Sequence, residues 1–169
     1  MTLMIMTGAY TLYVLTSIYV SVMQIGYINV AKRKEAVLLL PGEFLKAGNY
    51  GVEKEKLSIV NSFVDYLFFI AWIGFGVSTL QSNLFFENAA LGNVAIVMSF
   101  IVINFVASLP FGYYEKFALD AKFGFNKSSL SQWIKDTTIS FSMTLILGSL
   151  VVLGIYEIIA NFSQWWLWS

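Results

Sequence analysis

The chain has 169 residues, of which 58% are hydrophobic and 12% charged, whereas soluble domains average about 45–50% and about 25%. With 15 Phe, 9 Tyr and 5 Trp and a mean hydropathy of +0.73, it has more apolar surface than a water-facing globule of this size can bury, so the sequence predicts an integral membrane protein. Ten basic and ten acidic residues cancel, which argues against nucleic acid as a partner, and the lack of His and Cys removes the nitrogen and sulfur ligands of a zinc site.

Four apolar segments are separated by the charged residues. They cover residues 3–30, 57–80, 94–114 and 137–160, and each is longer than eighteen residues. A helix of about twenty residues crosses a hydrocarbon core of about 30 Å, so we expect four transmembrane helices. The first has no basic residue before it and is too long for a signal peptide, so we expect it to be retained.

The end of the sequence is rich in tryptophan. Residues 164–169 read Gln-Trp-Trp-Leu-Trp-Ser, and tryptophans of this kind suit a membrane interface. No polar tail follows them, so we interpret the ending as an interruption.

The basic residues predict the orientation of the spans. Six lie in the connection 31–56, four lie in the connection 115–136, and none lies in residues 81–93. By the positive-inside rule the first and third connections face the cytoplasm. Both termini and the second connection are then expected on the outer side, in the cell inner membrane if the protein is bacterial.

Polar residues recur at helical spacing inside the spans. An i, i+3, i+4, i+7 series occupies one face of a helix, so each strip faces something other than lipid. Packing between helices through small and hydroxyl residues and a water-filled cavity are both compatible with the pattern, which does not separate them. The candidate chamber-lining residues are Ser58, Asn61 and Asp65 in the second span and Thr137, Ser140 and Thr144 in the fourth.

Asp65 is the most informative single residue in the spans. It lies about eight positions into the second span, about 12 Å from the cytoplasmic end. A carboxylate at a helix centre costs about 2.5–3.5 kcal/mol on insertion scales, so it should face a partner or water. Our hypothesis is that it faces a hydrated interior shared with the first and fourth spans; the alternative is a structural Asp bonded to a neighbouring polar side chain.

Both predicted cytoplasmic connections contain local start signals for helices. Pro41 and Gly42 are expected to start a short amphipathic helix over residues 44–56 that leads into the second span. Residues 123–126, Phe-Gly-Phe-Asn, predict a turn. Ser129 to Gln132 has the form of a capping box. A helix from Leu130 through the fourth span, to residue 160, would have 31 residues and reach about 46 Å, so it should project into the cytoplasm.

Two segments resemble one protein family. Ala47 to Lys54 is similar to the A-x-x-Y-x-x-x-K segment of type I CAAX prenyl proteases, the integral-membrane zinc metallopeptidases of the sterile-24 kind. Leu109 to Lys127, followed by Trp133 and Asp136, resembles that family's L-P-x-x-x-Y-x-x-F-x-x-E-E-x-F-G-F-N-K-x-T…F…D signature. The matching positions are Ala47, Tyr50, Lys54, Leu109, Pro110, Phe117, Asp120, Phe123, Gly124, Phe125, Asn126, Lys127 and Asp136.

The sequence departs from this family pattern at four positions. Asp120 and Ala121 replace the paired acids, Ser129 stands where Thr is usual, and Trp133 stands where Phe is usual. The departures concern only the fine detail of that loop. The order of elements and the hydropathy fit the family over nearly the whole chain.

The resemblance implies an α-helical barrel around a hydrated chamber, to which this chain contributes four long transmembrane helices and, in residues 164–169, the start of a fifth. It also implies a zinc site built by an H-E-x-x-H helix and a downstream Glu, and cleavage of prenylated or other membrane-associated polypeptides on the cytoplasmic side. With no His, residues 1–169 match only the amino-terminal membrane domain. We therefore predict no catalytic and no metal-ligating residue in this chain, and zinc only in the full-length enzyme.

The partners implied are the lipid bilayer, the missing catalytic region of the same protein, and a peptide or prenylated-protein substrate of the full-length form. A stand-alone four-helix membrane scaffold or regulatory pseudoprotease is the alternative, and a small transporter is a third. The absence of Lys and Arg from the spans argues against a voltage sensor and weakens the transporter interpretation.

Overall fold

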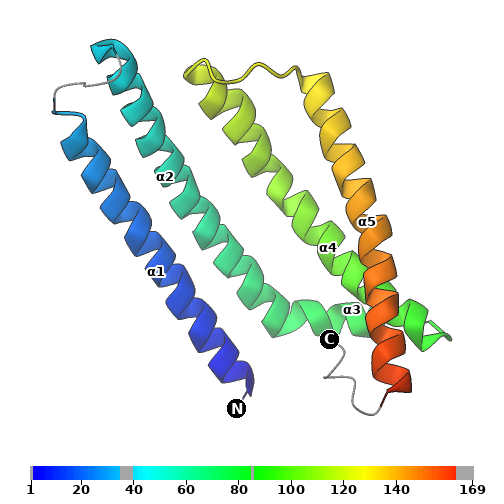
Figure 1. Cartoon of the computed structure of the whole chain (residues 1–169). Helices are drawn as coiled ribbons and strands as arrows, with labels where there is room; N and C mark the ends of the chain where they lie inside the picture. The colour runs from blue at the N-terminus through cyan, green and yellow to red at the C-terminus, as the bar shows by residue number, and fades with distance from the viewer. Residues whose placement is uncertain (1, 35–39, 85, 163–169) are drawn as a thin grey trace. The chain divides into compact units, whose positions relative to one another are not determined.

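The computed structural model describes residues 2–34, 40–84 and 86–162, and all the regular structure in these residues is helical (Figure 1). This confirms the predicted all-α class. The expected start of a fifth helix in residues 164–169 lies outside the described residues. In chain order the elements are α1 (Thr2–Ala31), α2 (Pro41–Ala71), the π-helix η1 (Trp72–Gly76), α3 (Val77–Asn83), α4 (Ala89–Tyr114), the π-helix η2 (Glu115–Asp120) and α5 (Leu130–Asn161).

Four helical runs within the described residues are long and apolar enough to cross a membrane. They are Leu3–Ala31, Pro41–Asn83, Ala89–Asp120 and Leu130–Asn161. Each of the four predicted spans lies in one of these helices, and the second, third and fourth runs extend well beyond the predicted bounds. The protein is therefore an integral, multi-pass membrane protein.

The second run is the longest, with 43 residues. It begins at Pro41, with Leu40 as its N-cap, which suits proline because the first turn of a helix needs no donor there. The amphipathic segment expected over residues 44–56 is continuous with the span and forms the first turns of α2. Gly48 and Gly51 lie inside this continuous helix where α1 comes close to α2, and a Cβ at Gly51 would lie 3.2 Å from Ile28 Cδ1.

The chain forms two compact units, which are described separately. Unit 1 comprises residues 1–73 and 110–127, and unit 2 comprises residues 74–109 and 128–169. In unit 1, α1 and α2 lie side by side and run in opposite directions (Figure 1). All residues that are buried in the described part of the chain belong to unit 1: Val14, Ser21, Val52, Leu119 and Phe123.

Part of the polar strip of the first span lies in the α1–α2 contact; the residues of that strip at helical spacing are Tyr10, Tyr13, Ser17, Ser21 and Gln24. Tyr10 packs on Phe69 with ring centroids 4.1 Å apart, and the hydroxyls of Thr11 and Tyr66 are 3.1 Å apart. Ser21 is buried. Tyr10 and Ser21 of the strip are therefore used in packing, whereas Tyr13 of the same strip is 66% exposed.

In unit 2, α4 and α5 run in opposite directions and are joined by a ring stack (Figure 1). Phe105 and Phe141 lie 3.8 Å apart between centroids, with their planes within 9°. A Cβ at Gly148 would lie 3.4 Å from Met98 Cε, so glycine lets the helices approach there. Much of the surface of α5 is apolar and exposed, including Ile146 and Leu150.

The start of α5 agrees with the prediction. Ser129 is the N-cap, and its hydroxyl accepts a hydrogen bond from the backbone N–H of Gln132 at 3.2 Å. The helix has 32 residues, which corresponds to about 48 Å. It is therefore longer than the hydrocarbon core, as expected.

Candidate functional site

The two segments that carry the family resemblance contact each other in unit 1. The phenol of Tyr50 on α2 donates a hydrogen bond to Asp120 Oδ1 at 2.9 Å. One turn further along α2, Lys54 Nζ lies 3.0 Å from Glu115 Oε1. We call Tyr50, Lys54, Glu115, Asp120, Phe123 and Phe125 the motif cluster.

Helix geometry explains why both polar pairs form at once. Tyr50 and Lys54 are four residues apart and so share one face of α2. Glu115 and Asp120 are five residues apart, a spacing that would separate them on an α-helix. They span the π-helix η2, whose i→i+5 hydrogen bonds place residues five apart about one turn apart. Both carboxylates can therefore reach α2.

The turn after η2 holds two aromatic rings against Tyr50. Gly124 adopts a φ of +72°, a left-handed conformation that favours glycine. The backbone N–H of Phe125 donates to the carbonyl of Asp120 at 2.8 Å, and that of Asn126 donates to it at 3.3 Å. The predicted turn over residues 123–126 is confirmed.

The rings themselves form the apolar side of the cluster. Phe123 and Phe125 lie 5.5 Å and 4.8 Å from Tyr50 between centroids, both edge-on. Phe123 is 8% exposed, whereas Phe125 is 50% exposed. The ammonium of Lys46 lies 5.7 Å from the centroid of the Phe125 ring. The cluster thus combines a buried ring with charge-assisted hydrogen bonds.

A mostly apolar pocket of about 380 Å³ lies beside the cluster. Its walls come from α2 and from the end of α4 with η2. Glu53 and Lys56 provide its polar edge. The remaining lining residues are Leu57, Val60, Pro110, Phe111, Tyr114 and Leu119.

Five of the other motif residues lie outside the cluster. Ala47 and Lys127 are exposed, and Phe117 packs on Tyr113 at 5.0 Å between centroids. Leu109 and Asp136 belong to unit 2. The motif therefore mixes residues of the cluster with residues that are only near it in sequence.

Glu115 belongs to the cluster but was not among the predicted site residues. The i, i+4 spacing of Tyr50 and Lys54 could have indicated it. Two hydrogen-bond donors on one face of α2 predict two carboxylate acceptors on one face of a partner helix. Asp120 provides one acceptor. On a regular α-helix, Glu115 would not share its face.

Four of the six candidate chamber-lining residues take part in local hydrogen bonds. The Asp65 carboxylate is exposed and accepts a hydrogen bond from Asn61 Nδ2 at 3.3 Å. The Thr144 hydroxyl donates to the Ser140 carbonyl at 2.9 Å. Ser58 is exposed and Thr137 is partly exposed. The α2 residues belong to unit 1 and the α5 residues to unit 2.

The side chains of this chain do not fit a catalytic zinc. Such a site needs about three ligands, typically His with Glu, Asp or Cys, that converge on one position, and the sequence has neither His nor Cys. Within the described ranges, no three acidic side chains are placed to hold a metal ion. The contacts described above join α2 to η2 and to the turn after it.

Comparison with known families decides what the cluster belongs to. A family model described as the amino-terminal part of CAAX prenyl proteases, with five membrane helices, matches residues 35–169. The chain belongs to the CAAX prenyl protease family. The match covers both sides of the motif cluster and corresponds to the amino-terminal membrane domain only.

Curated relatives place the same domain in longer proteins. A CAAX prenyl protease 1 homolog of Oryza sativa subsp. japonica is 27% identical over 139 residues, covering 76% of this chain and 33% of the relative. CAAX prenyl protease 1 of Saccharomyces cerevisiae is 28% identical over 138 residues, covering 74% and 30%. The chain thus spans about a third of the length of these CAAX prenyl proteases.

A solved structure shares the fold. The crystal structure of S. mikatae Ste24p aligns with a TM-score of 0.80 at 19% identity, covering 94% of this chain and 40% of that chain. The helical membrane fold of this CAAX prenyl protease domain is therefore that of the Ste24p structure over nearly the whole chain.

Proposed function

We propose that this domain forms part of the wall of a hydrated chamber in a zinc metalloendopeptidase. The substrates of the full-length enzyme are CAAX-type prenylated or other membrane-associated polypeptides. The domain contributes shape and positioning, and residues 1–169 alone hold no zinc and cleave no peptide. The catalytic ligands come from another region of the same polypeptide.

The observation that carries the proposal is the motif cluster. Its two halves are the segments that resemble the family, they lie 70 residues apart at Tyr50 and Asp120, and they are joined by hydrogen-bonded contacts. The family match runs through both. A local assembly that joins the two matching segments supports a role of this domain in shape and positioning.

Within the chamber, we assign the water-facing surface to the two polar strips. Ser58, Asn61 and Asp65 would line it from α2, and Thr137, Ser140 and Thr144 from α5. The exposed carboxylate of Asp65 supports this assignment, because an exposed charge in a span is costly against lipid.

The orientation is part of the proposal. Residues 31–56 and 115–136 face the cytoplasm and both termini face outward, because all ten basic residues lie in those two connections. The natural chain has no Cys, so a single cysteine at Asn49 or at Asn88 reports one side of the membrane. Labelling of Asn88→Cys by an impermeant thiol reagent only from the cytoplasmic side would overturn this topology.

The decisive experiment compares two polypeptides. One ends at Ser169, and the other continues along the gene's reading frame. We expect an H-E-x-x-H segment in that frame, with one bound zinc and chelator-sensitive cleavage of a prenylated peptide in the longer polypeptide only. Zinc binding or cleavage by residues 1–169, or a longer polypeptide without either, would contradict the proposal.

The second candidate function is a stand-alone membrane scaffold or regulatory pseudoprotease that holds partners through its small-residue strips. A native stop codon directly after Ser169 would favour this function over the first.

A further inference from the structure

A second pocket in unit 1 is more basic than the apolar pocket beside the motif cluster. It has a volume of about 500 Å³ and lies between the end of α1, the middle of α2 and the turn after η2. Three lysines line it, Lys32, Lys56 and Lys122, together with one acidic residue, Glu53. At neutral pH these four side chains carry a net charge of plus two.

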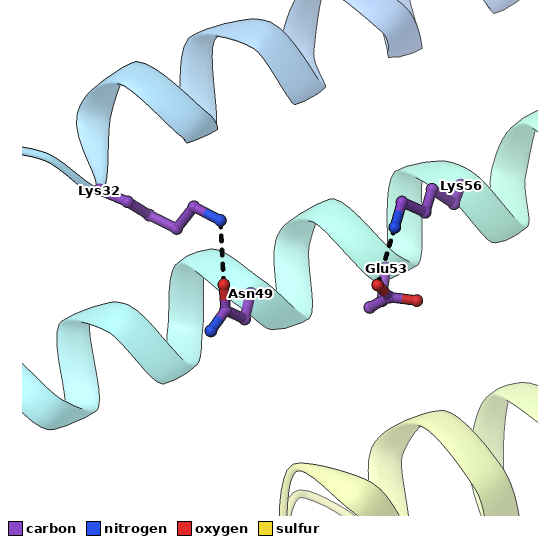
Figure 2. Close-up of polar contacts among 4 residues, drawn as sticks. All are labelled: Lys32, Asn49, Glu53 and Lys56. Carbon is purple, nitrogen blue, oxygen red and sulfur yellow. Dashed lines mark hydrogen bonds and ion pairs between the residues drawn. The ribbon is translucent and has the colours of Figure 1, made fainter.

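The arrangement of these charges leaves positive potential in the pocket. Lys56 Nζ lies 2.9 Å from Glu53 Oε1, while Lys32 Nζ donates to the neutral amide oxygen of Asn49 at 2.9 Å, as Figure 2 shows. Lys122 lies over the Phe123 ring, 5.5 Å from its centroid. Among the described residues, Lys56 is thus the only one of the three lysines in an ion pair, and one carboxylate cannot neutralise three ammonium groups.

The position of Lys32 depends on a glycine. A Cβ at Gly48 would lie 2.5 Å from Lys32 Cγ and 2.6 Å from Cδ, closer than atoms tolerate. Glycine at this position therefore lets the aliphatic stem of Lys32 lie across α2 and brings its ammonium to Asn49. The lysine is held in the pocket wall.

The floor of the pocket is apolar and packed. Val52 and Phe123 line it and are only 7% and 8% exposed. Asn29 and Asn49 supply amide groups that can donate hydrogen bonds to an anion. The pocket therefore offers cationic and amide donors above an apolar surface.

The three lysines lie at the ends of apolar segments. Lys32 follows the last residue of α1, Lys56 directly precedes the apolar segment of the second span, and Lys122 lies two residues beyond η2. Ends of spans lie at the level of the lipid head groups. Lysine binds phosphate as a point charge, and basic pockets between membrane helices bind acidic lipid head groups.

We propose that this pocket binds the phosphate-bearing head group of an anionic phospholipid. The ammonium groups of Lys32, Lys56 and Lys122 contact the phosphate, and the apolar floor contacts the glycerol region. The bound lipid would bridge α1, α2 and the turn after η2. This inference does not depend on peptidase activity, and its test does not measure that activity.

The test measures lipid binding to the purified 169-residue chain in mild detergent. Native mass spectrometry and thermal unfolding are recorded with added dioleoylphosphatidylglycerol, with dioleoylphosphatidylcholine, and with inorganic phosphate alone. We expect saturable binding and an increase in unfolding temperature with phosphatidylglycerol only. Equal effects of the two lipids, or an equal effect of inorganic phosphate, would overturn the proposal.

Two variants of equal charge locate the binding site. The pocket variant carries Lys32→Gln, Lys56→Gln and Lys122→Gln, and the matched control carries Lys116→Gln, Lys127→Gln and Lys135→Gln, which lie outside the pocket lining. We expect phosphatidylglycerol to bind the pocket variant about tenfold more weakly and the control within about twofold of the natural chain. An equal loss in both variants would show that the lipid responds to diffuse charge and would overturn the proposal.

The single variants Lys32→Gln and Lys122→Gln guard against misfolding of the triple variant. Neither residue is in the motif cluster, so we expect both to unfold in phosphatidylcholine at the temperature of the natural chain. Each should weaken phosphatidylglycerol binding, by less than the triple variant. Unchanged binding in both single variants would contradict the assignment of the phosphate to this pocket.

Discussion

The two units of the chain use their apolar residues in different ways. All buried residues in the described part of the chain lie in unit 1, where α1, α2 and η2 pack together. In unit 2, α4 and α5 share the Phe105–Phe141 stack, and large side chains such as Ile146 stay exposed. Both units expose large apolar side chains, for example Met4 in unit 1 and Ile146 in unit 2. Among the described residues, the difference is that unit 1 also has a small buried core, which stabilises its tertiary structure, whereas unit 2 has no buried residue.

The largest test of this comparison removes a buried ring. Phe123→Ala should lower the free energy of unfolding by about 3–5 kcal/mol, the usual cost of deleting a buried aromatic side chain. Phe75→Ala, in unit 2 and 65% exposed, should change it by no more than about 0.5 kcal/mol. Unfolding in mixed micelles, followed by tryptophan fluorescence, measures both. Equal effects would contradict the difference between the units.

The next test removes one hydroxyl from the motif cluster. Tyr50→Phe keeps the ring but leaves the Asp120 carboxylate without this donor, and we expect a loss of about 1.5–3 kcal/mol. The same change at Tyr156, on α5 in unit 2, should cost no more than about 0.5 kcal/mol. A double-mutant cycle with Asp120→Asn isolates the pair, and a coupling energy of zero would show that the hydrogen bond contributes nothing to stability.

A third test concerns the start of α5 in unit 2. Ser129→Ala removes the N-cap of α5 and should cost about 0.5–2 kcal/mol. The effect should appear as faster amide hydrogen exchange in the first turn of α5, with Ser131→Ala as the matched control. Unchanged exchange in that turn would mean that the observed 3.2 Å bond between Ser129 and Gln132 does not stabilise the helix start.

The smallest effect is expected at the exposed ion pair of the motif cluster. Lys54 and Glu115 are 53% and 39% exposed, so Lys54→Gln should cost only about 0.2–1 kcal/mol, and less at high salt. Unfolding titrations at low and high ionic strength test this, with Lys135→Gln as the control. A salt-independent loss as large as that of Tyr50→Phe would mean that the pair is not screened by solvent.

Local sequence signals predicted much of the fold. Pro41 starts a helix because it has no N–H group to leave unpaired in the first turn. Ser129 starts one because its hydroxyl accepts a hydrogen bond from an N–H group of the first turn. Both signals act within one helical turn, so a short stretch of sequence is enough to predict them. The four spans followed from apolar length alone. The turn at Gly124 could also be predicted locally, from the Phe-Gly-Phe-Asn sequence of residues 123–126 and from the helix start signal at Ser129 that follows it.

The motif cluster could be predicted only in part. Its two segments were recognised by resemblance, but the contact between Tyr50 and Asp120 joins residues 70 positions apart, and no local pattern sets that register. Both π-helices were missed, since their hydrogen bonding differs from that of an α-helix without any strong composition signal. The basic pocket was missed for a related reason: its lysines were counted only as markers of the cytoplasmic side.

The π-helix η2 can be viewed as a one-residue insertion in the helix that continues α4. If the same residues formed a regular α-helix, the five steps from Glu115 to Asp120 would leave the two side chains about 140° apart. Glu115 could then still meet Lys54, but Asp120 would face away from Tyr50. The wider turn of the π-helix absorbs the additional residue and keeps both acceptors on the same side of the helix.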